Sequence, residues 1–270
     1  MDHFNYAQGI LHAEDVPIPE IAAAVGTPFY VYSTATLLRH YRLFDEALDG
    51  IDHLVCYAMK AAGNQAILKT LAAAGAGMDV VSAGEYARAR AAGVPGDKIV
   101  FSGVGKTEAE MRTALEGGIR QFNVESEPEM EALNRVALSL GVSAPITIRV
   151  NPDVDAKTHA KITTGTKENK FGIEIEQAKS VYARAAALPH IDPVGVAMHI
   201  GSQLTDLAPY RAAYRRMADL VKALRAEGHD IRRVDLGGGI GIDYRGDHIV
   251  DLAGYAAIVR EEIAPLGAEM

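Results

Sequence analysis

The 270-residue chain is 49% hydrophobic and contains 27 basic and 35 acidic residues, which give it a formal net charge of −8 at pH 7. These charges are spread along the chain without a basic block, so the sequence predicts neither a nucleic-acid partner nor an anionic-membrane partner. Met1–Asn5 does not begin a signal peptide, and no run approaches the ~18 apolar residues of a transmembrane helix. We therefore expect a cytoplasmic protein, long enough for one large α/β domain.

Short β-rich runs alternate with longer amphipathic segments. The strand candidates are Phe29–Tyr32, Val55–Lys60, Met78–Ser82, Ile99–Ser102, Gln121–Glu125, Ile146–Val150, Val194–Ile200 and Val234–Leu236. The helix candidates include Thr34–Ala47, Gln65–Ala74, Ala83–Ala92 and Pro209–Glu227. Repeated βα units imply a parallel sheet covered by helices, and their number favours a (β/α)8 TIM-type barrel over a doubly wound sheet, which spacing alone leaves open. In either fold, functional side chains gather at the C-terminal ends of the strands.

Two regions interrupt this alternation. Residues 1–27 form a lead-in segment, and residues 28–270 form the expected barrel domain. Residues 151–173 form a polar loop that is much longer than the usual connection of about 2–6 residues, and loops of this kind typically carry function. Helix starts are marked by a capping box at Thr107 and Glu110 and by Ser126.

Lys60 ends the apolar run Val55–Met59 and precedes a helix start near Asn64. A primary amine at the end of a buried strand is partly desolvated, which favours its neutral, nucleophilic form. Such an amine can form a Schiff base with an aldehyde cofactor or a carbonyl substrate. The alternative, more common for a single lysine, is a side chain that extends into solvent as the strand ends. Cys56, the single cysteine, lies in the same run, and we expect a buried thiol in a reducing compartment.

Two further strand candidates end in polar or glycine residues. One ends near His199, with Ser202 after it, and at a barrel mouth the imidazole can stack on an aromatic ring while the hydroxyl donates to a phosphate. Another runs into Gly237-Gly238-Gly239, whose N–H groups can approach an anion closely. The alternatives are a buried structural histidine and a tight strand-to-helix turn. The glycines do not follow the spaced dinucleotide fingerprint.

Charged residues also interrupt the apolar strands. Asp79 lies on one of them, with Glu85 shortly after it, and a buried carboxylate needs a partner such as a nearby cationic lysine. Arg149 lies on another strand, so an internal structural pair between Asp79 and Arg149 is the alternative. The long loop contains acidic residues and a histidine without regular ligand spacing, so the sequence predicts no metal site there. These loop residues are Asp153, Asp155 and His159.

An amine, a ring support and a phosphate cup at strand ends are the three parts of a pyridoxal phosphate site. The combination resembles the fold-type III pyridoxal phosphate-dependent decarboxylases, which have an alanine racemase-like barrel. The resemblance covers nearly the whole chain, in the motifs Gly26–Tyr32, Cys56–Ala61, Met78–Glu85, Arg149–Val154, Thr164–Gly165, Glu168–Ile173, His199–Gln203 and Asp235–Gly239. The Lys-Phe-Gly-Ile sequence at residues 170–173 and the glutamine Gln203 look like the diaminopimelate branch rather than the ornithine branch.

The resemblance implies pyridoxal 5'-phosphate as the cofactor. The residues implied to bind it are Lys60, Asp79, Glu85, His199, Ser202, Gly237, Gly238 and Gly239. Lys60 would bind it covalently and His199 would stack on its ring, and these two would be the catalytic residues. The serine and the glycines would hold the phosphate, and the two carboxylates would lie near the covalent link.

The implied reaction converts meso-2,6-diaminopimelate to L-lysine and CO2 in a homodimeric enzyme of lysine biosynthesis. Two alternatives remain: a related decarboxylase acting on ornithine or arginine, and a catalytically inactive homologue that binds a partner. Family members are longer, with a further strand carrying Glu-Pro-Gly-Arg and a β domain. We therefore expect the chain to be an N-terminal piece of this family. The closing barrel strand would follow Met270, and the piece alone would be poorly stable and inactive.

Overall fold

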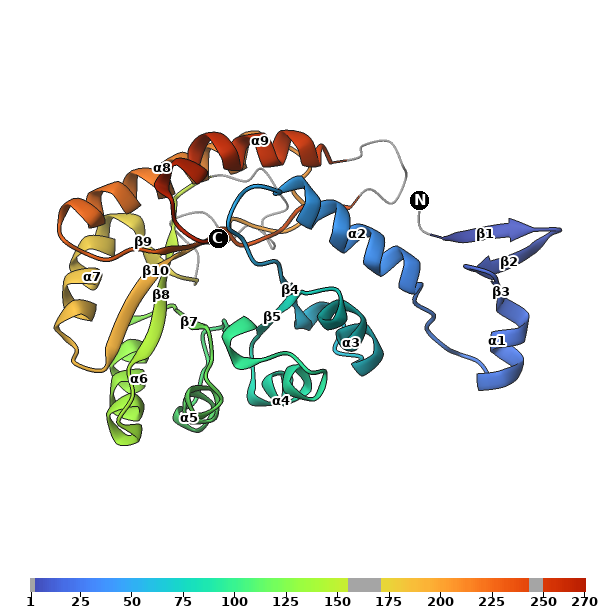
Figure 1. The fold of residues 1–270 in the computed structure, drawn as a ribbon, viewed down its shortest axis with the longest axis horizontal. Helices are drawn as coiled ribbons and strands as arrows, with labels where there is room; N and C mark the ends of the chain where they lie inside the picture. The colour runs from blue at the N-terminus through green and yellow to red at the C-terminus, as the bar shows by residue number, and fades with distance from the viewer. Residues whose placement is uncertain (1–2, 155–170, 243–249) are drawn as a thin grey trace.

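The computed structural model of the protein describes residues 3–154, 171–242 and 250–270 (Figure 1). The loop residues Asp155 and His159, the motif Thr164–Gly165 and the first three residues of the motif Glu168–Ile173 lie outside the described residues. Most of the described chain forms a curled sheet ringed by helices, and residues 3–25 form a smaller lobe beside it (Figure 1).

The central sheet has the strand order β11-β10-β8-β7-β6-β5-β4, with the short β9 paired to β8. Its strands are β4 (Cys56–Ala58), β5 (Gly77–Val80), β6 (Ile99–Phe101), β7 (Gln121–Val124), β8 (Ala144–Asn151), β9 (Ile173–Glu174), β10 (Ile191–Ala197) and β11 (Arg233–Asp235). All of its pairs are parallel. Because the spatial order follows the chain order, without the reversal of a doubly wound sheet, the predicted TIM-type (β/α) barrel is confirmed.

Helices cover the outside of the sheet (Figure 1). The helices around the barrel are α2 (Thr34–Ala47), α3 (Gln65–Ala73), α4 (Ala83–Ala91), α5 (Glu108–Glu116), α6 (Glu127–Leu140), α7 (Ala178–Ala187), α8 (Ala208–Ala226) and α9 (Leu252–Glu262). Short 3-10 turns lie at η1 (Met59–Ala61), η2 (Gly96–Lys98), η3 (Ile175–Gln177) and η4 (Ala264–Leu266). The predicted helix starts are confirmed, with the reciprocal capping box of Thr107 and Glu110 at α5 and the Ser126 cap at α6.

The two edges of the sheet are joined by Glu269 and Met270. Both backbone groups of Glu269 are hydrogen-bonded along β11. On the other side, the N–H of Met270 donates to the carbonyl of Asp52 (3.0 Å), and the Met270 carbonyl accepts the N–H of Leu54 (2.7 Å). Glu269–Met270 therefore lies where an eighth strand belongs, between β11 and the segment that leads into β4. Glu269 and Met270 thus take the position of the closing strand, which was predicted to follow Met270.

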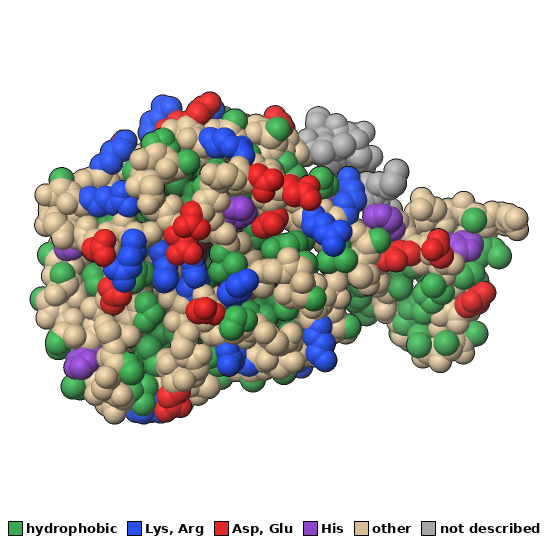
Figure 2. All heavy atoms as spheres, viewed as in Figure 1, with side chains coloured by type: hydrophobic (Ala, Val, Ile, Leu, Met, Phe, Trp, Pro, Cys, Tyr) green, Lys and Arg blue, Asp and Glu red, His purple; other side chains and the backbone are tan. Residues whose placement is uncertain are grey.

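Residues 3–25, predicted as part of a lead-in, contain a small antiparallel sheet and a helix. These elements are β1 (Phe4–Ala7), β2 (Ile10–Ala13), β3 (Val16–Pro17) and α1 (Ile18–Val25). The Glu14 carboxylate joins the lobe to the start of α2, where it accepts bonds from Ser33 Oγ (2.7 Å) and the N–H of Ala35 (2.8 Å). Hydrophobic side chains lie at the surface of the lobe (Figure 2), and the exposed ones include Tyr6, Val16 and Val25.

The strand predicted at Phe29–Tyr32 is absent, so this prediction is wrong. The segment has no regular secondary structure and pairs with no strand, and the Tyr30 side chain is 92% exposed. Its aromatic and β-branched residues resemble a strand in composition, but strand propensity needs a neighbouring strand and a surface to pack on. The barrel sheet therefore begins at β4.

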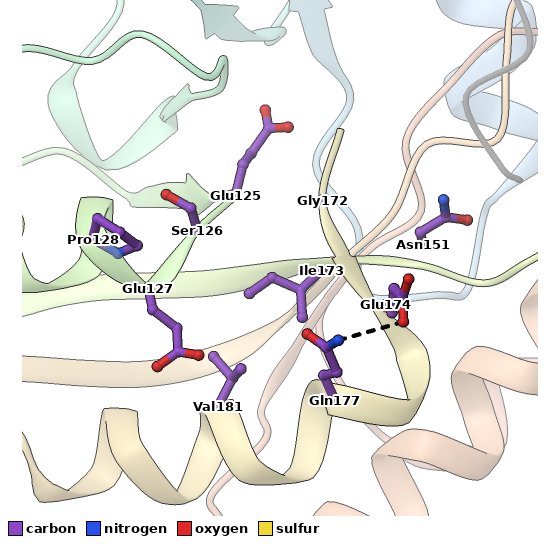
Figure 3. A pocket seen from close by; sticks show the side chains of 10 residues that line it. All are labelled: Glu125, Ser126, Glu127, Pro128, Asn151, Gly172, Ile173, Glu174, Gln177 and Val181. Carbon is purple, nitrogen blue, oxygen red and sulfur yellow. Dashed lines mark hydrogen bonds between the residues drawn. The ribbon is translucent and has the colours of Figure 1, made fainter. Parts of the chain in front are cut away.

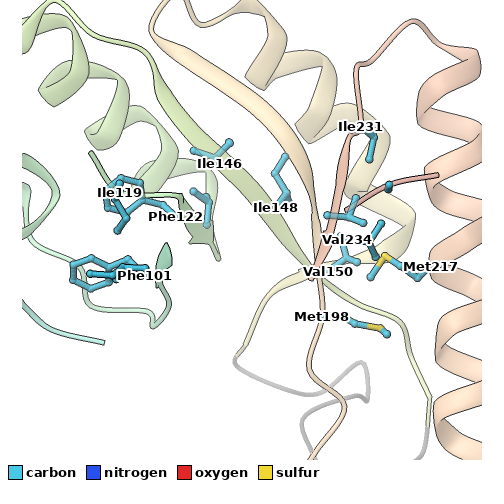
Figure 4. Close-up of a cluster of buried hydrophobic side chains, with 14 of the residues drawn as sticks. Phe101, Ile119, Phe122, Ile146, Ile148, Val150, Met198, Met217, Ile231 and Val234 are labelled. Carbon is cyan, nitrogen blue, oxygen red and sulfur yellow. The ribbon is translucent and has the colours of Figure 1, made fainter. Parts of the chain in front are cut away.

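Side chains of the barrel strands alternate between an apolar set and a polar set. Phe101, Phe122 and Ile148 are fully buried in the apolar cluster that includes Met217 of α8 (Figure 4). The intervening positions are more polar, and Asn123 of β7 reaches Asp235 of β11 although these strands are not neighbours. Because only side chains inside a barrel meet across it, the interior of this barrel is partly polar, whereas parallel strands are typically apolar on both faces. No helix among the described residues is long and apolar enough to cross a membrane.

Gly195→Ala should destabilise the barrel because β10 and β11 pack closely at this position. A Cβ at Gly195 would lie 2.2 Å from the carbonyl oxygen of Arg233. We expect the free energy of unfolding to fall by about 1–3 kcal/mol, the usual cost of overpacking, in denaturant titrations. Gly105→Ala is the matched control, since a Cβ there has no neighbour within 4 Å. Equal stability of the two variants would contradict the close packing of β10 and β11.

Candidate functional site

Lys60 lies just beyond the C-terminal end of β4. The predicted strand is too long at this end, because β4 stops at Ala58 and the chain enters the 3-10 turn η1. Met59 is buried and anchors the turn. Lys60 is exposed, which differs from the partial desolvation that we expected for its amine. The amine is therefore carried at the mouth of the barrel, on the face where barrel enzymes place their reactive groups.

Asp79 lies on β5, and its Oδ1 is buried without a hydrogen-bond partner among the described residues. Burial is the main cause that raises the pKa of Asp79 to about 6. The Ser102 hydroxyl and the charge of Lys60 act in the opposite direction, and Asp235 adds to the rise. Asp79 and Lys60 are therefore close enough for their charges to interact.

A polar network crosses the barrel interior next to Asp79. The Asn123 amide donates to Ser102 Oγ (3.1 Å) and, across the barrel, to Asp235 Oδ2 (2.8 Å). The other oxygen of Asp235, Oδ1, accepts the N–H of Gly237 (2.9 Å). Asp235 thus connects the barrel interior to the first residue of the glycine turn Gly237–Gly239.

His199 follows β10 and lies against the glycine turn, where its Nδ1 accepts the N–H of Gly238 at 3.4 Å. Burial is the main cause that lowers the pKa of His199 to about 4, and the charges of Arg149 and Lys60 lower it further. The imidazole is therefore neutral at pH 7. An acceptor Nδ1 places its single proton on Nε2.

The glycine turn packs its backbone directly against the segment that follows β10. Gly237 and Gly239 adopt φ values of 69° and 93°, which only glycine adopts readily. A Cβ at Gly237 would lie 2.3 Å from the Met198 carbonyl oxygen, and one at Gly239 would lie 1.9 Å from that of Gly201. Side chains at these positions would separate the ends of β10 and β11.

Ser202 lies in this same segment and is exposed. The N–H of Leu204 donates to the Gly239 carbonyl and the N–H of Gly241 donates to the Leu204 carbonyl, both at 2.9 Å, so the two segments run side by side. Among the described residues, the Ser202 hydroxyl and the Gly239 N–H have no hydrogen-bond partner. Two donors thus remain for an anionic ligand at the mouth of the barrel.

Arg149 of β8 is held by Glu125 and not by Asp79, the partner that the sequence suggested as an alternative. Its Nη1 lies 3.0 Å from Glu125 Oε1, and its guanidinium lies over the Phe171 ring, 5.2 Å from the centroid. The same Glu125 oxygen accepts the N–H of Gly103 (3.2 Å), whereas Oε2 is buried without a partner among the described residues. The ion pair fixes the cation that helps to keep His199 neutral.

A buried ion pair supports Glu125 in turn. Lys106 Nζ lies 2.6 Å from Glu129 Oε1, and these side chains are 1% and 9% exposed. Lys106 also donates to the carbonyls of Gly103 and Asn123, while Glu129 Oε2 accepts the N–H of Glu125 (3.0 Å). All three Lys106 donors are satisfied, as a buried ammonium requires.

Glu85 lies in the first turn of α4, where its Oε2 accepts the N–H of Val81 (2.8 Å). No hydrogen bond or ion pair of the described residues joins it to Lys60, so the structure does not bring it into direct contact with the amine. The described part of the chain also contains no group of three or more His, Cys, Asp or Glu residues placed to hold a metal.

A cavity of about 360 Å³ opens beside Glu125, at the ends of β7 and β8 (Figure 3). It is lined by Glu125, Ser126, Glu127, Pro128, Asn151, Gly172, Ile173, Glu174, Gln177 and Val181. The amide of Gln177 donates to Glu174 at 3.4 Å on one side of it (Figure 3). Neither Lys60 nor His199 lines this cavity. It is therefore separate from the strand-end cluster, by which we mean Lys60, His199, Ser202 and the glycine turn.

Sequence reasoning missed the polar residues that support the cluster, above all Asn123 and Asp235. Their signal was weak, because each shares its short strand with another polar residue, Gln121 in β7 and Arg233 in β11, and so does not stand out as Asp79 does. Their pairing across the barrel has no local signature, since 112 residues separate them. Asp235 stood in a recognised motif, but no role was assigned to it.

Asp79→Asn should stabilise the protein at neutral pH. The folded-state pKa of about 6 exceeds the unfolded value, so the contribution of Asp79 to stability is complete below about pH 4 and is lost as the pH rises through 6. An amide does not ionise, and we expect a gain of up to about 3 kcal/mol at pH 7 that vanishes near pH 4. Denaturant titrations from pH 4 to 8 measure it, with the exposed Asp97→Asn as the control. A gain that is independent of pH would contradict the buried-carboxylate account.

Comparisons with known proteins identify the family to which the barrel belongs. A sequence model described as the pyridoxal binding domain of pyridoxal-dependent decarboxylases matches residues 34–268. Diaminopimelate decarboxylase of Vibrio cholerae is 55% identical over 246 residues, which cover 91% of this chain and 59% of the relative. That of Pseudomonas aeruginosa is 53% identical over 264 residues, covering 97% of the chain and 63% of the relative.

Solved structures give the same result. The Helicobacter pylori diaminopimelate decarboxylase complexed with L-lysine superimposes with a TM-score of 0.89 at 42% identity, covering 93% of this chain and 64% of that one. The enzyme from M. jannaschii superimposes with a TM-score of 0.92 at 38% identity, covering 100% and 64%. The chain thus spans about three fifths of the length of the relatives that it matches. It belongs to the pyridoxal-dependent decarboxylases, by a match to their pyridoxal binding domain.

Proposed function

We propose that the protein is a pyridoxal phosphate-dependent lyase that decarboxylates meso-2,6-diaminopimelate to L-lysine and CO2, the last step of lysine biosynthesis. The observation that carries the proposal is the convergence of Lys60, His199 and the glycine turn at one mouth of the barrel. The substrate follows from relatives named diaminopimelate decarboxylase, which are 44–55% identical to this chain. Structures named lysine and lysine/ornithine decarboxylases resemble the fold at only 22–23% identity, so they do not favour a different substrate.

The residues at the barrel mouth fit the cofactor. A phosphate needs donors that are not already used, and the Gly239 N–H and the Ser202 hydroxyl have no other acceptor among the described residues. The turn that carries Gly239 has no Cβ atoms in the way, which allows close approach of the backbone to an anion. We therefore assign the phosphate to the space beside Ser202 and the glycine turn.

We assign the covalent link to Lys60 and the ring contact to His199. The exposed position of Lys60 leaves its amine accessible to an aldehyde. His199 is neutral at pH 7 because burial and two nearby cations lower its pKa, so it offers an uncharged ring face for stacking. When bound, pyridoxal phosphate supplies an electron sink for the carbon that loses its carboxylate.

Two acidic residues are assigned supporting roles of different kinds. The charge of Asp79 attracts that of Lys60 from the barrel interior, which draws the exposed amine towards the ends of the strands. Glu85 accepts the N–H of Val81 and so holds the turn between β5 and α4. We assign it a supporting role without direct contact with Lys60.

We also propose that the protein is cytoplasmic and forms a homodimer. The free thiol of Cys56 fits a reducing compartment. The homodimer rests on the family resemblance.

Reduction with borohydride in the presence of pyridoxal phosphate should fix the phosphopyridoxyl group on Lys60. Peptide mapping by mass spectrometry locates it, and Lys60→Arg should abolish the labelled peptide because a guanidinium does not condense with the aldehyde. Lys98 and Lys106 serve as internal controls, since their Nζ atoms already donate to backbone carbonyls. Labelling at either of them in place of Lys60 would overturn the assignment.

The intact protein should release CO2 from meso-diaminopimelate much faster than from ornithine or arginine. The relatives with high identity carry the diaminopimelate name, and substrate discrimination of this kind follows from pocket groups that are left unpaired by the wrong substrate. The measurement is side-by-side turnover of the three amino acids at equal concentration. Preference for ornithine or arginine would replace the proposed substrate, and no turnover of any of them would favour an inactive homologue.

A further inference from the structure

A cluster of three buried tyrosines packs behind the glycine turn. Tyr210 and Tyr214 lie on α8 and Tyr255 on α9, and all three rings are at most 3% exposed. Tyr210 meets Tyr255 edge to face at a centroid distance of 5.3 Å and lies 5.8 Å from the Tyr214 ring. Aromatic contacts of this kind hold the rings in fixed positions.

The three hydroxyl groups have different partners. Tyr214 and Tyr255 bond to each other at an O–O distance of 2.7 Å, inside the cluster. The Tyr210 hydroxyl instead leaves the cluster and donates to the carbonyl oxygen of Gly238 at 3.2 Å. Burial raises the pKa of the Tyr210 phenol, so this group remains a neutral donor at physiological pH. Tyr210 is therefore the member of the cluster that contacts the glycine turn.

The contact fixes more than the carbonyl that it binds. The Gly238 carbonyl and the Gly239 N–H belong to the same peptide unit, which is planar, and in the trans form they point in opposite directions. When Tyr210 holds the carbonyl towards the tyrosine cluster, the Gly239 N–H must point away from it. This is the N–H that has no acceptor among the described residues.

The peptide between two glycines needs such a constraint. Glycine populates positive and negative φ about equally, so rotation of the Gly238–Gly239 peptide costs little unless one of its groups is held. The neighbouring contacts hold other atoms: Asp235 binds the Gly237 N–H, and Leu204 binds the Gly239 carbonyl. Of the described contacts, the Tyr210 bond is the one that acts on the Gly238 carbonyl.

We propose that Tyr210 is a positioning residue that orients the Gly239 N–H towards the phosphate of the bound cofactor. The inference rests on the proposed phosphate position and adds a residue remote from the ligand. Tyr210 acts through the peptide plane and does not touch the cofactor. It favours the phosphorylated form of the cofactor, because a ligand without a phosphate offers no acceptor to the oriented Gly239 N–H.

Tyr210→Phe removes this hydroxyl and keeps the ring packing. We expect the dissociation constant of pyridoxal phosphate to rise roughly three- to ten-fold, the loss of one hydrogen bond, while that of pyridoxal stays unchanged. Both are measured on the apoprotein from the visible absorbance of the lysine-bound ligand. Tyr214→Phe is the matched control, because it removes a hydroxyl from the same helix and cluster that does not reach the glycine turn.

The ratio of the two dissociation constants separates the outcomes. A smaller preference for the phosphorylated ligand in Tyr210→Phe alone supports the positioning role. An equal loss of both ligands, an unchanged ratio, or the same change in Tyr214→Phe would overturn it. If the unmodified protein itself binds pyridoxal as tightly as pyridoxal phosphate, the proposed phosphate position fails, and with it the proposed role of Tyr210.

Discussion

The hydrogen bond between Asn123 and Asp235 across the barrel is the contact on which the mouth of the barrel depends. A carboxylate inside a barrel is costly unless its oxygens are bonded. Asp235 satisfies one oxygen with the Asn123 amide and the other with the Gly237 N–H. The same group therefore fixes the spacing of β7 and β11 and the first residue of the glycine turn. The polar interior and the turn at the strand ends form one connected structure.

The cluster at the mouth is built from the groups that this framework positions. The glycine turn packs against the segment after β10, which places His199 and Ser202 beside it. On the other side, Glu125 holds Arg149, and the charge of Arg149 helps to keep His199 neutral. Behind the turn, the tyrosine cluster holds the peptide that carries the remaining donor. His199, Ser202 and the glycine turn thus lie on backbone that is held by polar contacts, whereas Lys60 lies on a turn anchored by the buried Met59.

Most of the barrel could be predicted from the sequence because its signals are local. Apolar runs and helix caps located the barrel strands except the short β9, and the helices α2 to α6 and α8. The helices α7 and α9 and the elements of the N-terminal lobe were not predicted. The strand predicted at Phe29–Tyr32 is absent, since composition does not reveal whether a strand has a neighbour. The strand-end residues were found because each interrupts a pattern. The pairing of Asn123 with Asp235, the Glu125 partner of Arg149 and the contact of Tyr210 with Gly238 are long-range, so neither periodicity nor a motif indicates them.

The central claim is that the ends of β4, β10 and β11 together form the cofactor site. A crystal structure of the protein with pyridoxal phosphate tests it most directly. The account predicts the ligand joined to Lys60, its ring against His199, and its phosphate within hydrogen-bond distance of the Gly239 N–H and the Ser202 hydroxyl. A phosphate bound elsewhere, for example in the cavity beside Glu125, would contradict it.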